Sequence, residues 1–184
     1  MRYNEQFDQY IQLLGKWNRS INLIQKDSMD SIYERHIKDS MQICDLLSKD
    51  ECIIDVGSGA GFPGVVLAIC GFENIVLCEK NLKKTVFLRD VRSKLGLKFE
   101  IFNDDICKFK ESGFTAVSRA FGSLGLLLET MLAISSPKGV FHKGESYEDE
   151  IRVAKELFDF EYKFRPSATN KESVIIAVSG VKRK

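Results

Sequence analysis

The sequence predicts an α/β fold, in which a mostly parallel, seven-stranded sheet carries helices on both faces and follows a helical N-terminal extension. From Asp50 onward, short apolar segments typical of strands alternate with segments of helical spacing, and this alternation indicates βαβ units. A glycine-rich turn joins the first strand pattern to the first helix pattern, which predicts a ligand-binding edge early in the sheet. Because 184 residues suffice for one domain, we expect an extension over 1–49 packed on a single compact unit over 50–184.

The extension is expected to contain two helices. The first, over 3–18, is amphipathic, with apolar side chains at three- and four-residue spacing that include Phe7, Tyr10, Leu14 and Trp17. Residues 18–24 break this period, and a second helix is expected to begin near Asp30. Within it, Arg35 and Asp39 are one turn apart and able to form an ion pair. His36, between them, is expected to be partly buried beside a solvated face.

The glycine turn discriminates between cofactors. A strand over 52–56 leads through Asp55-Val56-Gly57-Ser58-Gly59-Ala60-Gly61 into a helix over 62–70. Without Cβ atoms, the glycine backbone can turn sharply and bring its N–H groups against a ligand. Dinucleotide-binding turns have the spacing G-x-G-x-x-G, which would need a glycine where Phe62 stands. The observed spacing resembles motif I of S-adenosylmethionine (AdoMet) methyltransferases and therefore predicts AdoMet as the cofactor.

Two charged side chains are expected at the same edge of the sheet, because the carboxyl ends of parallel strands meet there. Glu79 ends the second strand, over 75–79, and can accept hydrogen bonds from both hydroxyls of a ribose. Arg119 follows the fourth strand, over 114–118, and can pair with the carboxylate of the methionine part of the cofactor.

The other elements alternate as the fold requires. A helix over 82–95 ends at Gly96, a residue type suited to a helix C-terminus. The rest are a strand over 99–102, a helix over 123–134, a strand over 140–142, a helix over 145–158, and strands over 160–164 and 173–179.

The charge distribution limits how the protein can bind nucleic acid. A net charge of +1 excludes a global basic field, so any contact with phosphates must use a local patch. The segment from Lys80 to Lys98 holds seven basic residues and one acidic residue, and is the first candidate. The second candidate is the group formed by Arg19, Arg35 and Lys38.

Cysteine usage and hydropathy bear on the compartment. The five cysteines are far apart and form no C-x-x-C pair, which indicates thiols of a reducing cytosol rather than disulfides or metal ligands. No apolar segment has the length of a signal core or of a membrane span. We therefore expect a cytoplasmic protein, monomeric, that binds neither a metal nor a membrane.

The absence of two motifs narrows the range of possible methyl acceptors. Exocyclic amines of adenine or cytosine are typically methylated beside an Asp/Asn-Pro-Pro-aromatic loop, and the chain has no Pro-Pro pair. Cytosine C5 chemistry requires a nucleophilic cysteine, often after proline, and no Pro-Cys pair occurs. A ring nitrogen such as guanine N7 already presents a lone pair and needs neither a base nor a nucleophile. These absences leave a ring-nitrogen acceptor open without proving it.

The whole chain resembles the bacterial RsmG family, also called glucose-inhibited division protein B. The matching segments are Asn22-Leu23, Glu34-Arg35-His36 with Asp39-Ser40, Asp55 to Gly64, Ser118-Arg119-Ala120, and Lys143-Gly144. The resemblance implies a Rossmann-like AdoMet-dependent methyltransferase fold. It also implies methylation of N7 of a single guanine, of the guanine-527 type, in the decoding-region loop of 16S rRNA, with 16S rRNA or the small ribosomal subunit as the partner.

The resemblance also assigns site residues. It implies that an AdoMet pocket is lined by Gly57, Phe62, Ile106, Cys107 and Arg119, with Glu79 on the ribose, and the glycine turn adds Gly59 and Gly61. No residue is expected to act as a general base. The candidates for positioning the reactants are Arg35, His36, Asp39 and Lys143.

Two other functions remain open at this point. A methyltransferase of the same fold that acts on a small molecule or a protein would agree with the near-zero net charge. A ribosome-associated module that binds AdoMet without turnover would keep the same pocket. Turnover of the cofactor on small subunits distinguishes the three.

Overall fold

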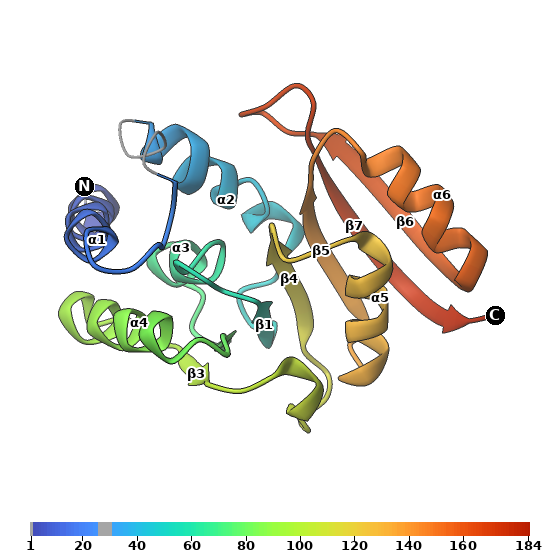
Figure 1. Ribbon diagram of the computed structural model, residues 1–184, viewed down its shortest axis with the longest axis horizontal. Helices are drawn as coiled ribbons and strands as arrows, with labels where there is room; N and C mark the ends of the chain where they lie inside the picture. Colours follow the sequence, from blue (N-terminus) through green and yellow to red (C-terminus); the bar gives the residue numbers. More distant parts are fainter. Residues whose placement is uncertain (1, 26–30) are drawn as a thin grey trace.

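One mixed sheet of seven strands forms the centre of the molecule (Figure 1). The computed structural model describes residues 2–25 and 31–184. The strands follow the order β3-β2-β1-β4-β5-β7-β6, in which β1 to β5 pair in parallel and β7 is antiparallel to both of its neighbours. Their bounds are β1 Ile53–Val56, β2 Ile75–Cys78, β3 Glu100–Phe102, β4 Thr115–Arg119, β5 Lys138–Lys143, β6 Phe158–Pro166 and β7 Val174–Arg183. The predicted fold class is confirmed.

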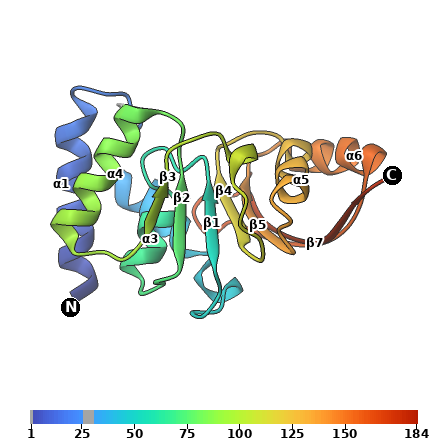
Figure 2. The ribbon, with the colours of Figure 1, turned by 90° about the horizontal axis from the view of Figure 1, so that it is seen from below.

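Helices cover both faces of the sheet, and consecutive strand residues contribute to opposite faces. Ile53 packs in a core shared with α1, α3 and α4, whereas Ile54 packs in a second core shared with α5 and α6. Figure 2 shows α1 and α4 side by side at one end of the molecule and α6 at the other. The helix bounds are α1 Arg2–Asn18, α3 Gly64–Ile69, α4 Leu82–Leu95, α5 Leu124–Ala133 and α6 Tyr147–Leu157.

The N-terminal segment packs against the glycine turn. In α1, Phe7, Tyr10 and Leu14 are buried as the apolar spacing predicts, and the Tyr10 hydroxyl donates to the carbonyl of Ala60 at 2.5 Å. This contact brings α1 directly behind the turn. The division of the chain at residue 50 into an extension and a domain stays a prediction.

The second predicted helix changes its hydrogen-bonding pattern along its length. It consists of the π-helix Tyr33–Lys38 (η2), α2 Asp39–Met41 and the 3-10 turn Cys44–Leu46 (η3), and its predicted start at Asp30 lies outside the described residues. The spacing allows an ion pair between Arg35 and Asp39, but these two residues do not form one. Asp39 instead pairs with Arg119 from β4, because the fold brings that guanidinium to the same face.

Other element boundaries also differ from the predicted ones. The helix predicted over 62–70 begins at Gly64, because residues 61–63 belong to the turn. Strands β5, β6 and β7 are longer than predicted, since the β6–β7 ladder pairs polar residues as well as apolar ones. Within residues 2–25 and 31–184, no helix combines the length and the apolar character that crossing a bilayer requires.

Candidate active site

The three glycines of the turn after β1 have different surroundings. Gly57, Gly59 and Gly61 all have positive φ, at 72°, 56° and 96°, a region that other residues rarely adopt. A Cβ added to Gly59 would meet nothing closer than the Gly57 carbonyl oxygen at 3.8 Å, so Gly59 faces open space. A Cβ on Gly61 would strike Val65 and approach the Tyr10 hydroxyl to 2.9 Å. Gly61 therefore serves packing behind the turn.

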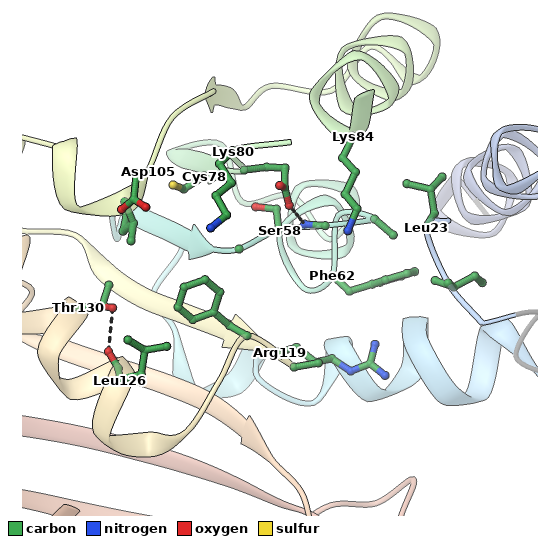
Figure 3. Close-up of a pocket in the computed structure, with 18 of the residues that line it drawn as sticks. Leu23, Ser58, Phe62, Cys78, Lys80, Lys84, Asp105, Arg119, Leu126 and Thr130 are labelled. Atoms are coloured by element: carbon green, nitrogen blue, oxygen red, sulfur yellow. Dashed lines mark hydrogen bonds between the residues drawn. The ribbon is translucent and has the colours of Figure 1, made fainter. Parts of the chain in front are cut away.

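A cavity of about 670 Å³ opens at the carboxyl ends of β1, β2 and β4, in front of this turn (Figure 3). All but one of the predicted cofactor residues lie in its wall, namely Gly57, Gly59, Phe62, Glu79, Ile106, Cys107 and Arg119. Gly61 is the exception, and the structure places it outside the wall. Arg35 and His36 also lie in the wall.

Four further wall residues were not predicted as part of the cofactor site. Phe121 follows β4, and Leu126 lies on α5. Lys80 and Lys84 point toward the cavity from the loop after β2 and from α4 (Figure 3). The two lysines belong to the basic segment that was predicted as a phosphate-facing surface, so part of that segment borders the cavity.

Glu79 is suited to bind a ribose. Its carboxylate accepts the N–H of Gly59 at 2.9 Å and the N–H of Asn81 at 2.7 Å, one on each oxygen. Each carboxylate oxygen has capacity for a second hydrogen bond. Glu79 can therefore hold the glycine turn and accept two ribose hydroxyls at the same time.

Asp55, the acidic residue that opens the motif, acts on the turn from behind. It is fully buried and accepts the N–H of Gly64 at 3.0 Å, which fixes the start of α3. Among the described residues, none donates a hydrogen bond to its other carboxylate oxygen. Burial raises the pKa of Asp55 to about 7, so its ionisation is costly inside the fold.

Arg119 joins β4 to the π-helix. Its Nε pairs with Asp39 at 2.8 Å, and its Nη2 donates to the carbonyl of Arg35 at 2.8 Å. Its Nη1 lies 2.8 Å from Nδ1 of His36. Because a guanidinium can only donate, His36 Nδ1 is the acceptor, and the proton of the neutral ring is on Nε2.

His36 is therefore held as a neutral ring. It stacks on Phe62 with ring centroids 5.0 Å apart. Burial, together with the positive charge of Arg119, lowers the pKa of His36 to about 4. At neutral pH its Nδ1 lone pair is occupied by Arg119, so this ring is a poor proton acceptor.

A second cavity, of about 580 Å³, adjoins the first. The two share Arg35, Arg119, Ala120 and Phe121. Asp39 and Lys143, the other two positioning candidates, lie in the wall of the second cavity only. The four candidates are thus divided between two neighbouring spaces.

Lys143 is engaged within the protein. Its side chain is 6% exposed and forms an ion pair with Glu150 at 2.5 Å. Its Nζ also donates to the carbonyl of Gly122 at 2.6 Å. Lys143 therefore fixes the loop after β4.

The sheet order, the glycine turn, the acid at the end of β2 and a cavity large enough for a nucleoside define the class of AdoMet-dependent methyltransferases. Solved structures share the fold. The magnesium protoporphyrin IX methyltransferase of Synechocystis, with bound SAM, superposes with a TM-score of 0.65 at 11% identity, covering 90% of this chain and 89% of that one. TYW2 of Pyrococcus horikoshii, in complex with MeSAdo, superposes with a TM-score of 0.53 at 18% identity. This match covers 80% of this chain and 62% of the other.

Sequence comparison identifies the family within this class. The model of the GidB family, which is described as rRNA small subunit methyltransferase G, matches residues 3–175 of this chain. "Ribosomal RNA small subunit methyltransferase G" of Orientia tsutsugamushi is 37% identical over 174 residues, 94% of this chain and 88% of the relative. The protein of the same name from Rickettsia felis is 35% identical over 179 residues, 96% and 93% of the two chains. The chain belongs to the rRNA small subunit methyltransferase G family, as its motifs predict.

The cofactor of this family is AdoMet, which confirms the predicted cofactor, and the cavity fits it. Gly59 leaves open the space that a side chain would fill, and Glu79 keeps acceptor capacity for a ribose. When bound, AdoMet supplies an electrophilic methyl group on a sulfonium. In the described part of the chain, no group of three or more His, Cys, Asp or Glu side chains is placed to hold a metal ion.

Replacing Glu79 by alanine is expected to weaken AdoMet binding by about 1–3 kcal/mol, because hydrogen bonds to a charged acceptor are lost. Isothermal titration calorimetry measures the change. Asn81→Ala is the matched control, since it removes the side chain that caps α4 and leaves the Glu79 carboxylate in place. It should lower stability by about 1 kcal/mol with little effect on AdoMet. Unchanged affinity in Glu79→Ala would mean that another group binds the ribose.

Proposed function

We propose that this protein transfers the methyl group of AdoMet to N7 of one guanine in the decoding-region loop of 16S rRNA. Family membership supports the rRNA of the small subunit as the substrate. The observation that supports N7 as the methylated atom is the composition of the wall that the two cavities share. It contributes two arginines, Arg35 and Arg119, while the adjacent His36 is neutral with its Nδ1 already bonded. Such a wall suits an acceptor that has no proton to lose.

The chemistry of methyl transfer to guanine N7 agrees with a wall that offers no proton acceptor. Methyl transfer from a sulfonium is an in-line displacement, so alignment and proximity supply much of the rate enhancement. Guanine N7 attacks with a lone pair that is already available, whereas a hydroxyl acceptor gains from a base. The described residues of this site are therefore expected to act by binding and orienting.

The direct test is a map of the product. Purified small subunits and naked 16S rRNA, each from cells that lack the gene, are incubated with the protein and isotopically labelled AdoMet. Mass spectrometry of nuclease fragments then locates the methyl group. We expect one N7-methylguanine in the decoding-region loop. A methyl group on an exocyclic amine or a ribose oxygen, or no turnover on either RNA substrate, would overturn the proposal.

The rate at saturating substrate is expected to be independent of His36 ionisation between about pH 6.5 and 9. The pKa of His36 is about 4, lower than the ordinary 6.5, so the folded protein keeps the ring neutral throughout this range. The sign for stability follows from linkage. The unfolded chain binds the proton more tightly, so this group makes the fold less stable as the pH falls from about 6.5 to 4. A pH–rate profile of the wild type and of His36→Ala checks the prediction. A fall in the wild-type rate near pH 6.5 that is absent from the variant would contradict it.

The RNA phosphates are proposed to contact the basic face of α4. Lys83 and Arg89 are exposed there and form no ion pair within the described residues, whereas Arg92 donates to the carbonyl of Phe99 and Lys94 pairs with Asp90. Lys84 points into the cofactor cavity (Figure 3). Lys83 and Arg89 are therefore the side chains of this helix best able to reach phosphates.

Reversing both charges, with Lys83→Glu and Arg89→Glu, should weaken binding to small subunits about tenfold or more and reduce the salt dependence of that binding. AdoMet affinity should be unchanged. The matched control reverses two exposed lysines toward the opposite edge of the sheet, Lys163 on β6 and Lys182 on β7, and should leave RNA binding nearly intact. Equal losses in both proteins would show that net charge, rather than the α4 face, controls binding.

The cytoplasmic location and the monomeric state stay predictions.

A further inference from the structure

The loop after β4 holds an aromatic ring between the two cavities. Ala120 has a φ of 57°, in the left-handed region that residues with a Cβ rarely adopt. This turn brings Phe121 over the glycine turn, so close to Gly57 that a Cβ on Gly57 would overlap the ring. Phe121 is half-buried and lies in the walls of both cavities. One part of the Phe121 ring therefore rests on the backbone of the glycine turn, while another part remains accessible from the cavities.

The loop is fixed from the side opposite the glycine turn. Lys143 donates to the Gly122 carbonyl, and its partner Glu150 accepts the N–H of Leu124 at 2.6 Å. The hydroxyl of Ser123 accepts the N–H of Leu126 and caps α5. The ion pair of the buried Lys143 with Glu150 and a helix cap therefore set the position of Phe121, which agrees with the role of a fixed surface for a ligand.

Methyl transfer requires the acceptor atom to reach the sulfonium methyl group at roughly 3–3.5 Å. The acceptor space must therefore open directly onto the cofactor cavity. The second cavity satisfies this condition, because it shares four wall residues with the first. A third cavity, beside Gln6 and Gly96, shares no wall residue with the cofactor cavity.

We propose that the second cavity receives the acceptor nucleobase and that the ring of Phe121 is the surface on which this base stacks. This inference rests on the proposed function only in that the acceptor is a base of RNA, whichever atom is methylated. Sequence-specific RNA recognition targets bases that have left the stack, and such bases stack on aromatic side chains and on arginine guanidinium planes. Phe121 supplies an aromatic ring at the boundary of the two spaces, and Arg35 and Arg119 supply guanidinium groups beside it.

The test compares Phe121→Leu with Phe121→Tyr. Leucine keeps an apolar contact with the glycine turn but has no aromatic face, whereas tyrosine keeps the face. We expect Phe121→Leu to raise the KM for small subunits about 10- to 100-fold, the scale of base–aromatic stacking, while Phe121→Tyr stays close to the wild type. Because Phe121 also borders the cofactor cavity, calorimetry measures AdoMet affinity in both variants, and we expect Phe121→Leu to change the KM for small subunits more than it changes AdoMet affinity.

The controls separate this inference from a folding defect and from the proposed function. Phe164→Leu removes an exposed aromatic ring on β6 that lies in neither cavity, and should leave the KM unchanged. Thermal melts establish that each variant is folded. Wild-type turnover on small subunits tests the proposed function first, and the variants are then compared only on the substrate that is methylated. An unchanged KM in Phe121→Leu, or a loss confined to AdoMet affinity, would overturn the stacking role.

Discussion

Replacing Gly59 by valine is expected to abolish AdoMet binding while the protein remains folded. The side chain would enter the open space in front of the turn, because nothing lies within 3.8 Å of the Cβ position. The N–H of Gly59 also donates to Glu79, the expected ribose acceptor. We expect affinity to fall on the order of 100-fold or more, which corresponds to about 2.7 kcal/mol or more. Calorimetry with AdoMet measures the loss.

Gly96→Val is the matched control for backbone strain. Gly96 has a φ of 61°, close to the 56° of Gly59, and a Cβ there also meets nothing within 4 Å. It lies at the C-terminus of α4, outside the cofactor cavity. Both variants should lose about 1–2 kcal/mol of stability from the left-handed backbone, and only Gly59→Val should lose AdoMet. Normal AdoMet binding by Gly59→Val would reduce the glycine turn to a structural role.

Replacing Arg119 by alanine is expected to damage both the fold and the site. The change leaves Asp39, whose side chain is 13% exposed, without its ionic partner. Removing one member of a buried ion pair typically costs 3–5 kcal/mol, and we expect about 2–3 kcal/mol here because Thr169 still donates to Asp39 at 2.6 Å. AdoMet affinity should also fall about tenfold or more through loss of the predicted contact with the methionine carboxylate. Chemical denaturation and calorimetry measure the two effects separately.

A second substitution separates the two roles of Arg119. In the Arg119→Ala background, Asp39→Asn removes the unpaired charge and should restore about half of the lost stability. AdoMet binding should remain weak, because the guanidinium is still absent. If binding returned together with stability, Arg119 would act on the cofactor only by holding the fold. Arg119→Lys tests the planar geometry, since a lysine supplies the charge without the three directed contacts.

Much of the cofactor site was predictable because it depends on local backbone rules. Three glycines at alternate positions allow the backbone to turn sharply, and the structure has positive φ at all three. Glu79 and Arg119 were placed at one edge because parallel strands end together, and both line the cavity. The prediction for Gly61 missed its surroundings, since sequence spacing does not say which side of a turn meets Tyr10.

The acceptor side of the site could not be predicted in the same way. Arg35 and Arg119 were both able to pair with Asp39, and helical spacing favoured the nearer one. The fold places the more distant arginine against the carboxylate, over a separation of 80 residues. Likewise, no motif distinguishes a lysine that positions a reactant from one that pairs with Glu150. Lys143 is predicted as a positioning candidate, and its ion pair with Glu150 is visible only in the structure.

The sequence alone determined the class of fold, the edge of the sheet that binds the ligand, AdoMet as the cofactor and the family of the chain. Each of these depends on the order of strands and helices along the chain or on residues within one turn. Only the tertiary structure decided the partner of Arg119, the neutral state of His36, the burial of Lys143, and the second cavity with Phe121 at its boundary. These features arise where segments distant in sequence pack together, and the energy of such contacts depends on distance and burial, which residue spacing does not specify.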